Sequence, residues 1–187
     1  MATGARRGTP LTPEEIYSTA LRLVDEGGVD ALSMRKLAAE LKVNPMSLYH
    51  HVDSKEALIT QICVTMADRL ELPPDDGAPW QDQLRMLALA YHTLARTYPT
   101  LYAYIHAHHE VIADRSVGIW VVLYRILRAA SIPEPDLKRT SDVLHAFVSG
   151  FVVAEAQGQV GDAADPAEAD RAFDTAIDMI IHGLAGR

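Results

Sequence analysis

Helix start and stop signals divide the first sixty residues into short segments, and they constrain the fold more than any other feature. Thr12-Pro13-Glu14-Glu15 predicts a helix start, with Thr as N-cap, Pro at the first helical position and Glu completing a capping box. Gly27-Gly28 ends this helix, because glycine readily adopts the left-handed conformation that closes helices. Ser33, Asn44 and Asp53 predict the caps of three further helices. Strand-like alternation is absent, so the chain is expected to be all-α.

The rest of the chain continues the helical pattern after a break at Pro73–Gly77. Helices are expected over about 80–98, 110–130, 136–158 and 166–184, with a short segment at 101–109. Residues 119–123 are apolar on every side, which predicts that their helix is the central buried one. We assign residues 1–60 to a first domain, with a basic arm at 1–11, and residues 61–187 to a second.

The net charge of −8 over 187 residues argues against a protein that coats nucleic acid, but the charge is uneven. Residues 1–60 hold seven Lys/Arg and eight Asp/Glu, whereas residues 61–187 hold ten and seventeen. The segment from Ser33 to Lys55 is net +2. The single cysteine, Cys63, excludes an intramolecular disulfide and is expected to be buried. No apolar run reaches the ~18 residues of a membrane span, and we expect a cytoplasmic protein with no membrane partner.

The second helix, a three-residue turn and the short third helix form a helix-turn-helix pattern. Leu48 is the inward anchor of the third helix. The other side chains of this two-turn helix have little to pack against, which makes sense if they meet a DNA groove. Arg35 and Lys55 flank this face and suit phosphate contacts, although Arg35 is also placed to reach a base. An ordinary helical turn with a polar surface is the competing interpretation.

The stretch from Ala31 to Leu58 resembles the tetracycline-repressor (TetR/AcrR) family, through its R-K-L-A, L-x-V and S-L-Y-x-H-V-x-x-K-x-x-L runs. The resemblance implies an obligate homodimer of nine or ten helices per chain, which represses transcription until a small molecule releases it from a near-palindromic double-stranded DNA operator. The family often has glycine where Lys42 stands, so this turn is expected to differ slightly. The positions that the resemblance places against DNA are Ser33, Met34, Arg35, Asn44, Pro45, Met46, Ser47, Tyr49, His50, His51 and Lys55.

The second domain resembles the family's ligand-binding and dimerisation domain through Trp80–Arg85. The resemblance makes the last two long helices the dimerisation elements, and their composition agrees. Gly150, Ala154 and Gly158 recur every four residues, which allows close approach of another helix in a four-helix bundle. The interface candidates are Val148, Phe151, Val152, Glu155, Phe173, Ile177 and Ile180.

The effector is expected to be an apolar or aromatic small molecule, held between central helices and oriented by His or Tyr groups. The candidate residues are Tyr102, His106, His109, Trp120, Tyr124 and His145. A metal at His106, His108, His109 and Glu110 stays open, but the spacing matches no zinc motif, and we expect no metal and no cofactor. We expect that the protein is not an enzyme. The rival hypotheses are a small hydrolase or metalloenzyme built on that histidine cluster, and a helical adaptor that has lost DNA binding.

Overall fold

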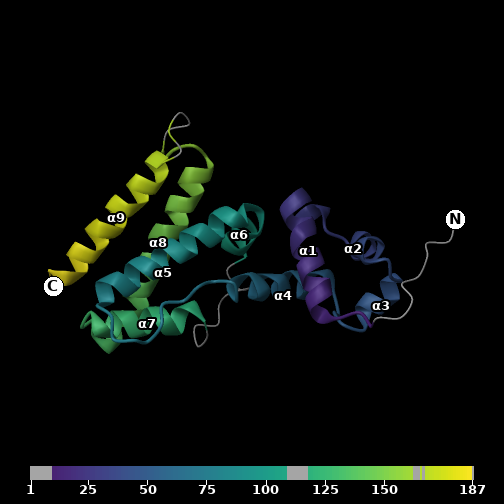
Figure 1. The fold of residues 1–187 in the computed structure, drawn as a ribbon, viewed down its shortest axis with the longest axis horizontal. Coiled ribbons are helices and arrows are strands. Elements are labelled where there is room, and N and C mark those ends of the chain that lie inside the picture. The colour runs from purple at the N-terminus through teal and green to yellow at the C-terminus, as the bar shows by residue number, and fades with distance from the viewer. Residues whose placement is uncertain (1–9, 109–117, 162–164, 166, 187) are drawn as a thin grey trace. The chain divides into compact units, whose positions relative to one another are not determined.

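The computed structural model describes residues 10–108, 118–161, 165 and 167–186, and nine α-helices are found among them. The all-α expectation is confirmed. The helices fall into two compact units, coloured along the chain in Figure 1. The first unit comprises residues 1–69 and 98–112, and the second comprises residues 70–97 and 113–187. The predicted domain boundary after residue 60 lies within one helix and stays a prediction.

The first unit is built from short helices, and α1 to α4 each begin with a side-chain cap. Its elements are α1 (Pro13–Gly27), the 3-10 helix η1 (Val29–Ala31), α2 (Met34–Leu41), α3 (Pro45–Tyr49), α4 (Lys55–Ala67) and α6 (Pro99–Ala107). Helix α1 packs against α2, α4 and α6. Ile16, Leu37, Leu48, Leu58 and Ile62 are completely buried and form the centre of this unit.

The caps follow the sequence signals with one exception. The Thr12 hydroxyl accepts a hydrogen bond from the Glu15 amide at 3.2 Å, and the Glu15 carboxylate accepts one from the Thr12 amide at 3.3 Å. Ser33 and Asn44 cap α2 and α3 as predicted. The Asp53 cap is wrong: Ser54 caps α4 by accepting from the Ala57 amide at 3.1 Å. The helix therefore starts one residue later than expected.

The second unit comprises α5 (Trp80–Thr97), α7 (Ile119–Ala129), α8 (Glu134–Ala156) and α9 (Ala167–Ala185). Helix α5 packs against the other three, so it occupies the centre of the unit. The expectation that the helix through residues 119–123 is the central buried one is wrong, because Val121 on α7 is 50% exposed. The apolar composition of a short segment does not indicate which helix is surrounded by other helices.

Two side-chain features complete the fold. Cys63 is buried, as expected, and desolvation raises the pKa of its thiol to about 12. None of the helices within the described ranges is long and apolar enough to cross a membrane.

Candidate nucleic-acid interface and ligand site

The turn between α2 and α3 is closed by Lys42 in the left-handed conformation, with φ of 57°. Its amide donates to the carbonyl of Ala39 at 3.2 Å, and the Val43 amide donates to the carbonyl of Ala38 at 3.0 Å. These bonds satisfy carbonyls at the end of α2, as a glycine would do at this position. Lysine therefore closes this turn in a conformation that glycine adopts more easily, at a cost in backbone strain.

Helix α3 is held by its cap and by one buried side chain. The Asn44 carboxamide oxygen accepts from the Met46 amide at 2.9 Å, which fixes the first turn. Leu48 is 0% exposed, whereas Met46 is 65% and Tyr49 45% exposed. The helix therefore presents its outer face to solvent, which is the arrangement expected of a helix that enters a groove.

The structure places the predicted DNA-facing residues on the surface of this unit. Met34, Ser47 and Lys55 are half-buried. The remainder are exposed: Ser33, Arg35, Asn44, Pro45, Met46, Tyr49, His50 and His51. Their exposure leaves the assignment to DNA contacts a prediction.

The predicted effector residues are divided between the two units. Tyr102, which is buried, and His106, which is exposed, belong to the first unit, with their rings 6.4 Å apart. Trp120, Tyr124 and His145 belong to the second. His109 lies outside the described residues. In the parts of the chain that are described, no group of three or more His, Cys, Asp or Glu side chains is placed to hold a metal ion.

Trp120 and His145 meet in an aromatic cluster inside the second unit. Their ring centroids are 5.0 Å apart in an edge-to-face arrangement. The Tyr91 ring adds a second edge contact to His145 at 5.8 Å, and the Ser149 hydroxyl lies 3.4 Å from His145 Nδ1. Tyr91 was not among the predicted effector residues, although it lies on the apolar face of α5. The cluster joins α5, α7 and α8 through one polar ring.

A second cluster, centred on His92, was missed entirely. The His92 ring stacks on Phe173 at 4.1 Å and makes an edge contact with Phe151 at 5.8 Å. His92 Nε2 lies 2.7 Å from Glu155 Oε2, and Arg96 Nε lies 3.4 Å from Glu155 Oε1. The signal was available, because His92 follows Ala88 by four residues on the buried face of α5. Phe151, Glu155 and Phe173, which were predicted at the dimer interface, are thus engaged within their own chain.

The remaining interface candidates show the same division between buried and accessible positions. Val148, Val152 and Ile177 are buried within the chain, and Ile180 is half-buried. The large apolar side chains exposed on these two helices are Val143, at 63%, and Met179, at 70%. Sequence periodicity shows which residues share a helix face. It does not show whether that face is already covered by other helices of the same chain.

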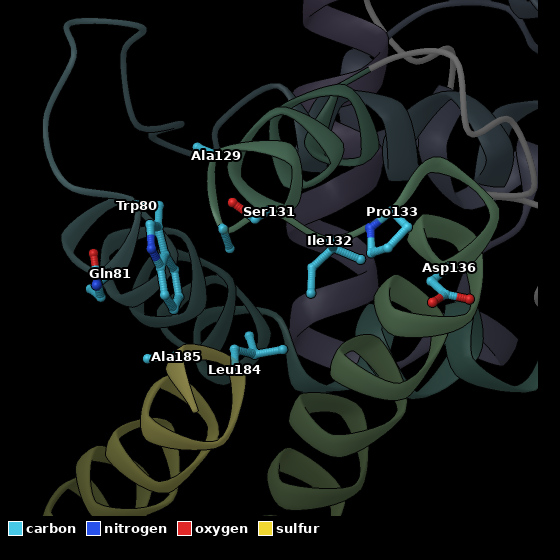
Figure 2. A pocket seen from close by; sticks show the side chains of 10 residues that line it. Trp80, Gln81, Ala129, Ser131, Ile132, Pro133, Asp136, Leu184 and Ala185 are labelled. Carbon is cyan, nitrogen blue, oxygen red and sulfur yellow. The ribbon is translucent and has the colours of Figure 1, made fainter. Parts of the chain in front are cut away.

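A recess of about 590 Å³ lies in the second unit, beside the start of α5 and the turn between α7 and α8 (Figure 2). Its lining residues are Trp80, Gln81, Ala129, Ala130, Ser131, Ile132, Pro133, Asp136, Leu184 and Ala185. None of the predicted effector residues that the structure describes is in this lining. The recess and the Trp120–His145 cluster are therefore separate features.

Both parts of the chain match models of known protein families. Residues 16–62 match the model of bacterial regulatory proteins of the tetR family, and residues 84–180 match that of the tetracyclin repressor-like C-terminal domain. An HTH-type transcriptional regulator of Saccharopolyspora erythraea is 28% identical over 78% of this chain and 61% of its own length. The HTH-type transcriptional repressor DrrR1 of Streptomyces coeruleorubidus is 26% identical over 80% of this chain and 54% of its own. The chain thus spans little more than half the length of these two relatives.

Solved structures of this fold extend over nearly the whole chain. ActR of Streptomyces coelicolor in complex with (S)-DNPA has a TM-score of 0.74 at 24% identity, covering 96% of this chain and 100% of its own. BioQ with its double-stranded DNA operator has a TM-score of 0.70 at 22% identity, covering 95% and 99%. With both domain models matched in order, the chain belongs to the tetracycline-repressor (TetR) family of bacterial regulatory proteins.

Proposed function

We propose that the chain is a homodimeric transcriptional repressor that binds an operator through α3 and is released by a small-molecule effector. The observation that carries this proposal is the outer face of α3, where Met46, Tyr49, His50 and His51 are exposed over one buried anchor, Leu48. The relative named a repressor and the related fold solved with its operator support the same function. We place its action in the cytoplasm.

The proposed DNA contacts divide into two kinds. Tyr49 and the two histidines that follow it offer hydrogen bonds to base edges or phosphates, and Met46 offers an apolar contact to a thymine methyl. Arg35 and Lys55 supply charge to the phosphates on either side. In a symmetric dimer, two α3 helices would enter successive major grooves about 34–36 Å apart.

The test uses a duplex that the protein itself selects from a random library. His50→Ala should weaken binding about tenfold or more, on the scale of one lost base contact. His182→Ala is the matched control, because His182 is an exposed histidine on α9. Equal affinities for the two variants would remove His50 from the interface. A protein that selects no duplex at low salt would refute the repressor function.

The proposed dimer face consists of small and apolar residues that the chain leaves accessible on α8 and α9. On α8 these are Val143, Phe147, Gly150 and Ala154; on α9 they are Ala172, Ala176, Met179 and Gly183. Each set is spaced by four, three and four residues, so that it follows one helix face. Among the residues that the structure describes, nothing lies within 4 Å of a Cβ built on Gly150 or Gly183, which leaves room for close approach of a second copy.

This face is tested by placing a carboxylate on it. Met179→Asp should shift the protein from dimer to monomer in sedimentation at micromolar concentration, because a buried unpaired charge is costly. Val121→Asp is the control, since Val121 is a similarly exposed apolar residue on α7. A dimer that tolerates Met179→Asp would exclude this part of α9 from the interface.

We propose that the effector is an apolar or aromatic molecule that contacts the Trp120–His145 cluster. The rings offer stacking surfaces, and the imidazole offers one directional hydrogen bond. The chain has two tryptophans, so Trp80→Phe leaves Trp120 as the only indole reporter. Aromatic compounds screened against this variant should quench its fluorescence, and His145→Leu should abolish the quenching. A compound that releases the duplex without affecting Trp120 would place the effector elsewhere.

A further inference from the structure

Arg125, on α7, holds the segment that joins α4 to α5. Its Nη2 donates to the carbonyl oxygen of Pro73 at 2.7 Å and lies 3.1 Å from that of Pro74. The same nitrogen lies 3.0 Å from Gln83 Oε1 on α5. One guanidinium on α7 thus contacts both α5 and the segment that precedes α5.

Gln83 extends this contact to the other end of the segment. Its Nε2 donates to the carbonyl oxygen of Ala78 at 2.8 Å, and the residue is only 7% exposed. The Ala78 amide in turn donates to Asp76 Oδ1 at 3.0 Å. Residues 73–78 are therefore fastened at both ends by the Arg125–Gln83 pair, which we call the linker clamp.

The chemistry of the segment explains why it needs such a clamp. Proline has no amide hydrogen, so Pro73 and Pro74 bring acceptors but no donors to any backbone pairing. The Pro73 ring is almost completely buried, and its carbonyl needs a partner within the protein. A guanidinium is well suited to this role. Its planar group carries several N–H donors that can bond to several oxygens, and it stays protonated. The Asp75 carboxylate, 3.9 Å from Arg125 Nε, offsets that charge.

The clamp lies within the second unit and holds the chain shortly after it enters that unit. Helix α4 ends at Ala67, and the chain passes from the first unit to the second after Arg69, shortly before Pro73. At the other end of the connection, α7 carries both Arg125 and Trp120, one ring of the proposed effector cluster. A helix that contacts the effector would thus also hold the chain that continues from the DNA-binding unit.

We propose that Arg125 is a positioning residue that couples α7 to the chain leaving α4, so that a displacement of α7 alters how the first unit engages DNA. This inference rests on the proposed repressor function. Its physical basis is linkage: if effector binding changes DNA affinity by some factor, DNA binding must change effector affinity by the same factor. DNA binding should therefore bias α7 toward the state that binds the effector less well. The coupling can therefore be measured from the DNA side, before any effector is identified.

The experiment is amide hydrogen exchange on the full chain, comparing wild type with Arg125→Met and Arg125→Lys. Arg128→Met is the matched control, because Arg128 lies one turn further along α7, is exposed and pairs with Glu134 instead. In the free protein, peptides covering residues 75–83 should exchange about tenfold faster in Arg125→Met, as expected for loss of a hydrogen bond of ordinary strength. Lysine keeps one donor and should restore part of this protection, whereas Arg128→Met should match wild type.

The second arm adds the duplex selected by the wild-type protein from a random library. Duplex binding should change exchange in residues 119–129 of wild type, and this change should shrink about fivefold or more in Arg125→Met. Protection of α3 by the duplex should persist in the variant, which separates lost coupling from lost DNA binding. Gln83→Leu removes the bonds to Ala78 and to Arg125 but keeps those from Arg125 to Pro73 and Pro74. It should have a smaller effect of the same kind and guards against misfolding of the arginine variants.

The outcomes are distinct. Unchanged exchange at residues 75–83 in Arg125→Met would overturn the inference, because the clamp would then hold nothing. A duplex that binds without altering α7 in wild type, or that alters α7 equally in the variant, would overturn it while leaving the repressor function intact. A chain that selects no duplex would refute the repressor function, and the coupling inference with it.

Discussion

The two units differ in how far along the chain their polar side chains reach. In the first unit, Thr12, Ser33, Asn44 and Ser54 each bond to a backbone amide two or three residues away. In the second unit, His92 and Glu155 are 63 residues apart, and Arg125 reaches back 52 residues to Pro73. The first unit caps its helices locally and has shorter polar contacts between segments, such as Arg22 with Glu40, 18 residues apart. The polar contacts of the second unit connect helices that are much further apart in the sequence.

This difference suits the two proposed roles. A unit whose DNA-facing helices are capped locally and anchored on one buried centre keeps its DNA-facing surface in one shape. In a unit whose polar groups connect α5, α7, α8 and α9, a molecule that moves one helix disturbs the others. Four changes, in order of decreasing expected effect, test whether the units behave in this way.

Phe173→Ala should have the largest effect, because this side chain is completely buried against His92 and Phe151. The cavity should lower the local unfolding free energy of α5, α8 and α9 by roughly 4 kcal/mol. Hydrogen exchange measures this loss helix by helix. If α1 to α4 lose protection equally, the two units unfold as one and the comparison fails.

Leu48→Ala should cost roughly 3 kcal/mol, since it removes the only buried side chain of α3. The loss should appear in α2, α3 and α4, and duplex binding should disappear with it. Urea unfolding followed by exchange in both units provides the measurement. Lost protection in α8 or α9 would mean that the first unit supports the second.

The His92–Glu155 pair should show a coupling energy of roughly 1–3 kcal/mol in a double-mutant cycle with His92→Ala and Glu155→Ala. Both side chains are shielded: removing Glu155 takes the carboxylate away from His92, and removing His92 leaves Glu155 with the Arg96 contact alone. The control cycle uses Lys138 and Asp142, an exposed pair on α8 that should couple by less than about 0.5 kcal/mol. Equal couplings would show that shielding adds nothing to the pair.

Lys42→Gly should have the smallest effect and the opposite sign. Lys42 has a φ of 57°, which disfavours every residue with a Cβ. Relief of this strain, offset by the greater freedom of glycine in the unfolded chain, should stabilise the first unit by about 0.5–1 kcal/mol. Thermal unfolding detects the shift. A destabilised variant would mean that the Lys42 side chain makes a contact that outweighs the strain.

Sequence reasoning succeeded where structure is local. The capping box at Thr12 and the caps at Ser33 and Asn44 are patterns of two to four neighbouring residues, and each is found where it was predicted. The error at Asp53 has the same origin, because Asp53 and Ser54 are both good caps and only the path of the chain decides between them.

The second unit could be predicted only as a set of helices. Nothing near His92 indicates that its partner is Glu155, and nothing near Arg125 indicates two proline carbonyls far upstream. The assignment of Phe173 to a dimer interface had the same weakness, since an apolar helix face looks alike whether its own chain or a second copy covers it. Which partner covers a face is a property of the packed helices, not of one segment.

The single anchor of α3 has an evolutionary consequence. Folding demands little of this helix beyond its cap and Leu48, so its exposed positions are free to vary without loss of the fold. Duplicated copies of such a gene can therefore acquire new operators through a few surface substitutions while their stability stays nearly constant. A short recognition helix with one buried anchor thus allows related regulators to change the DNA sequences that they bind while their fold stays the same.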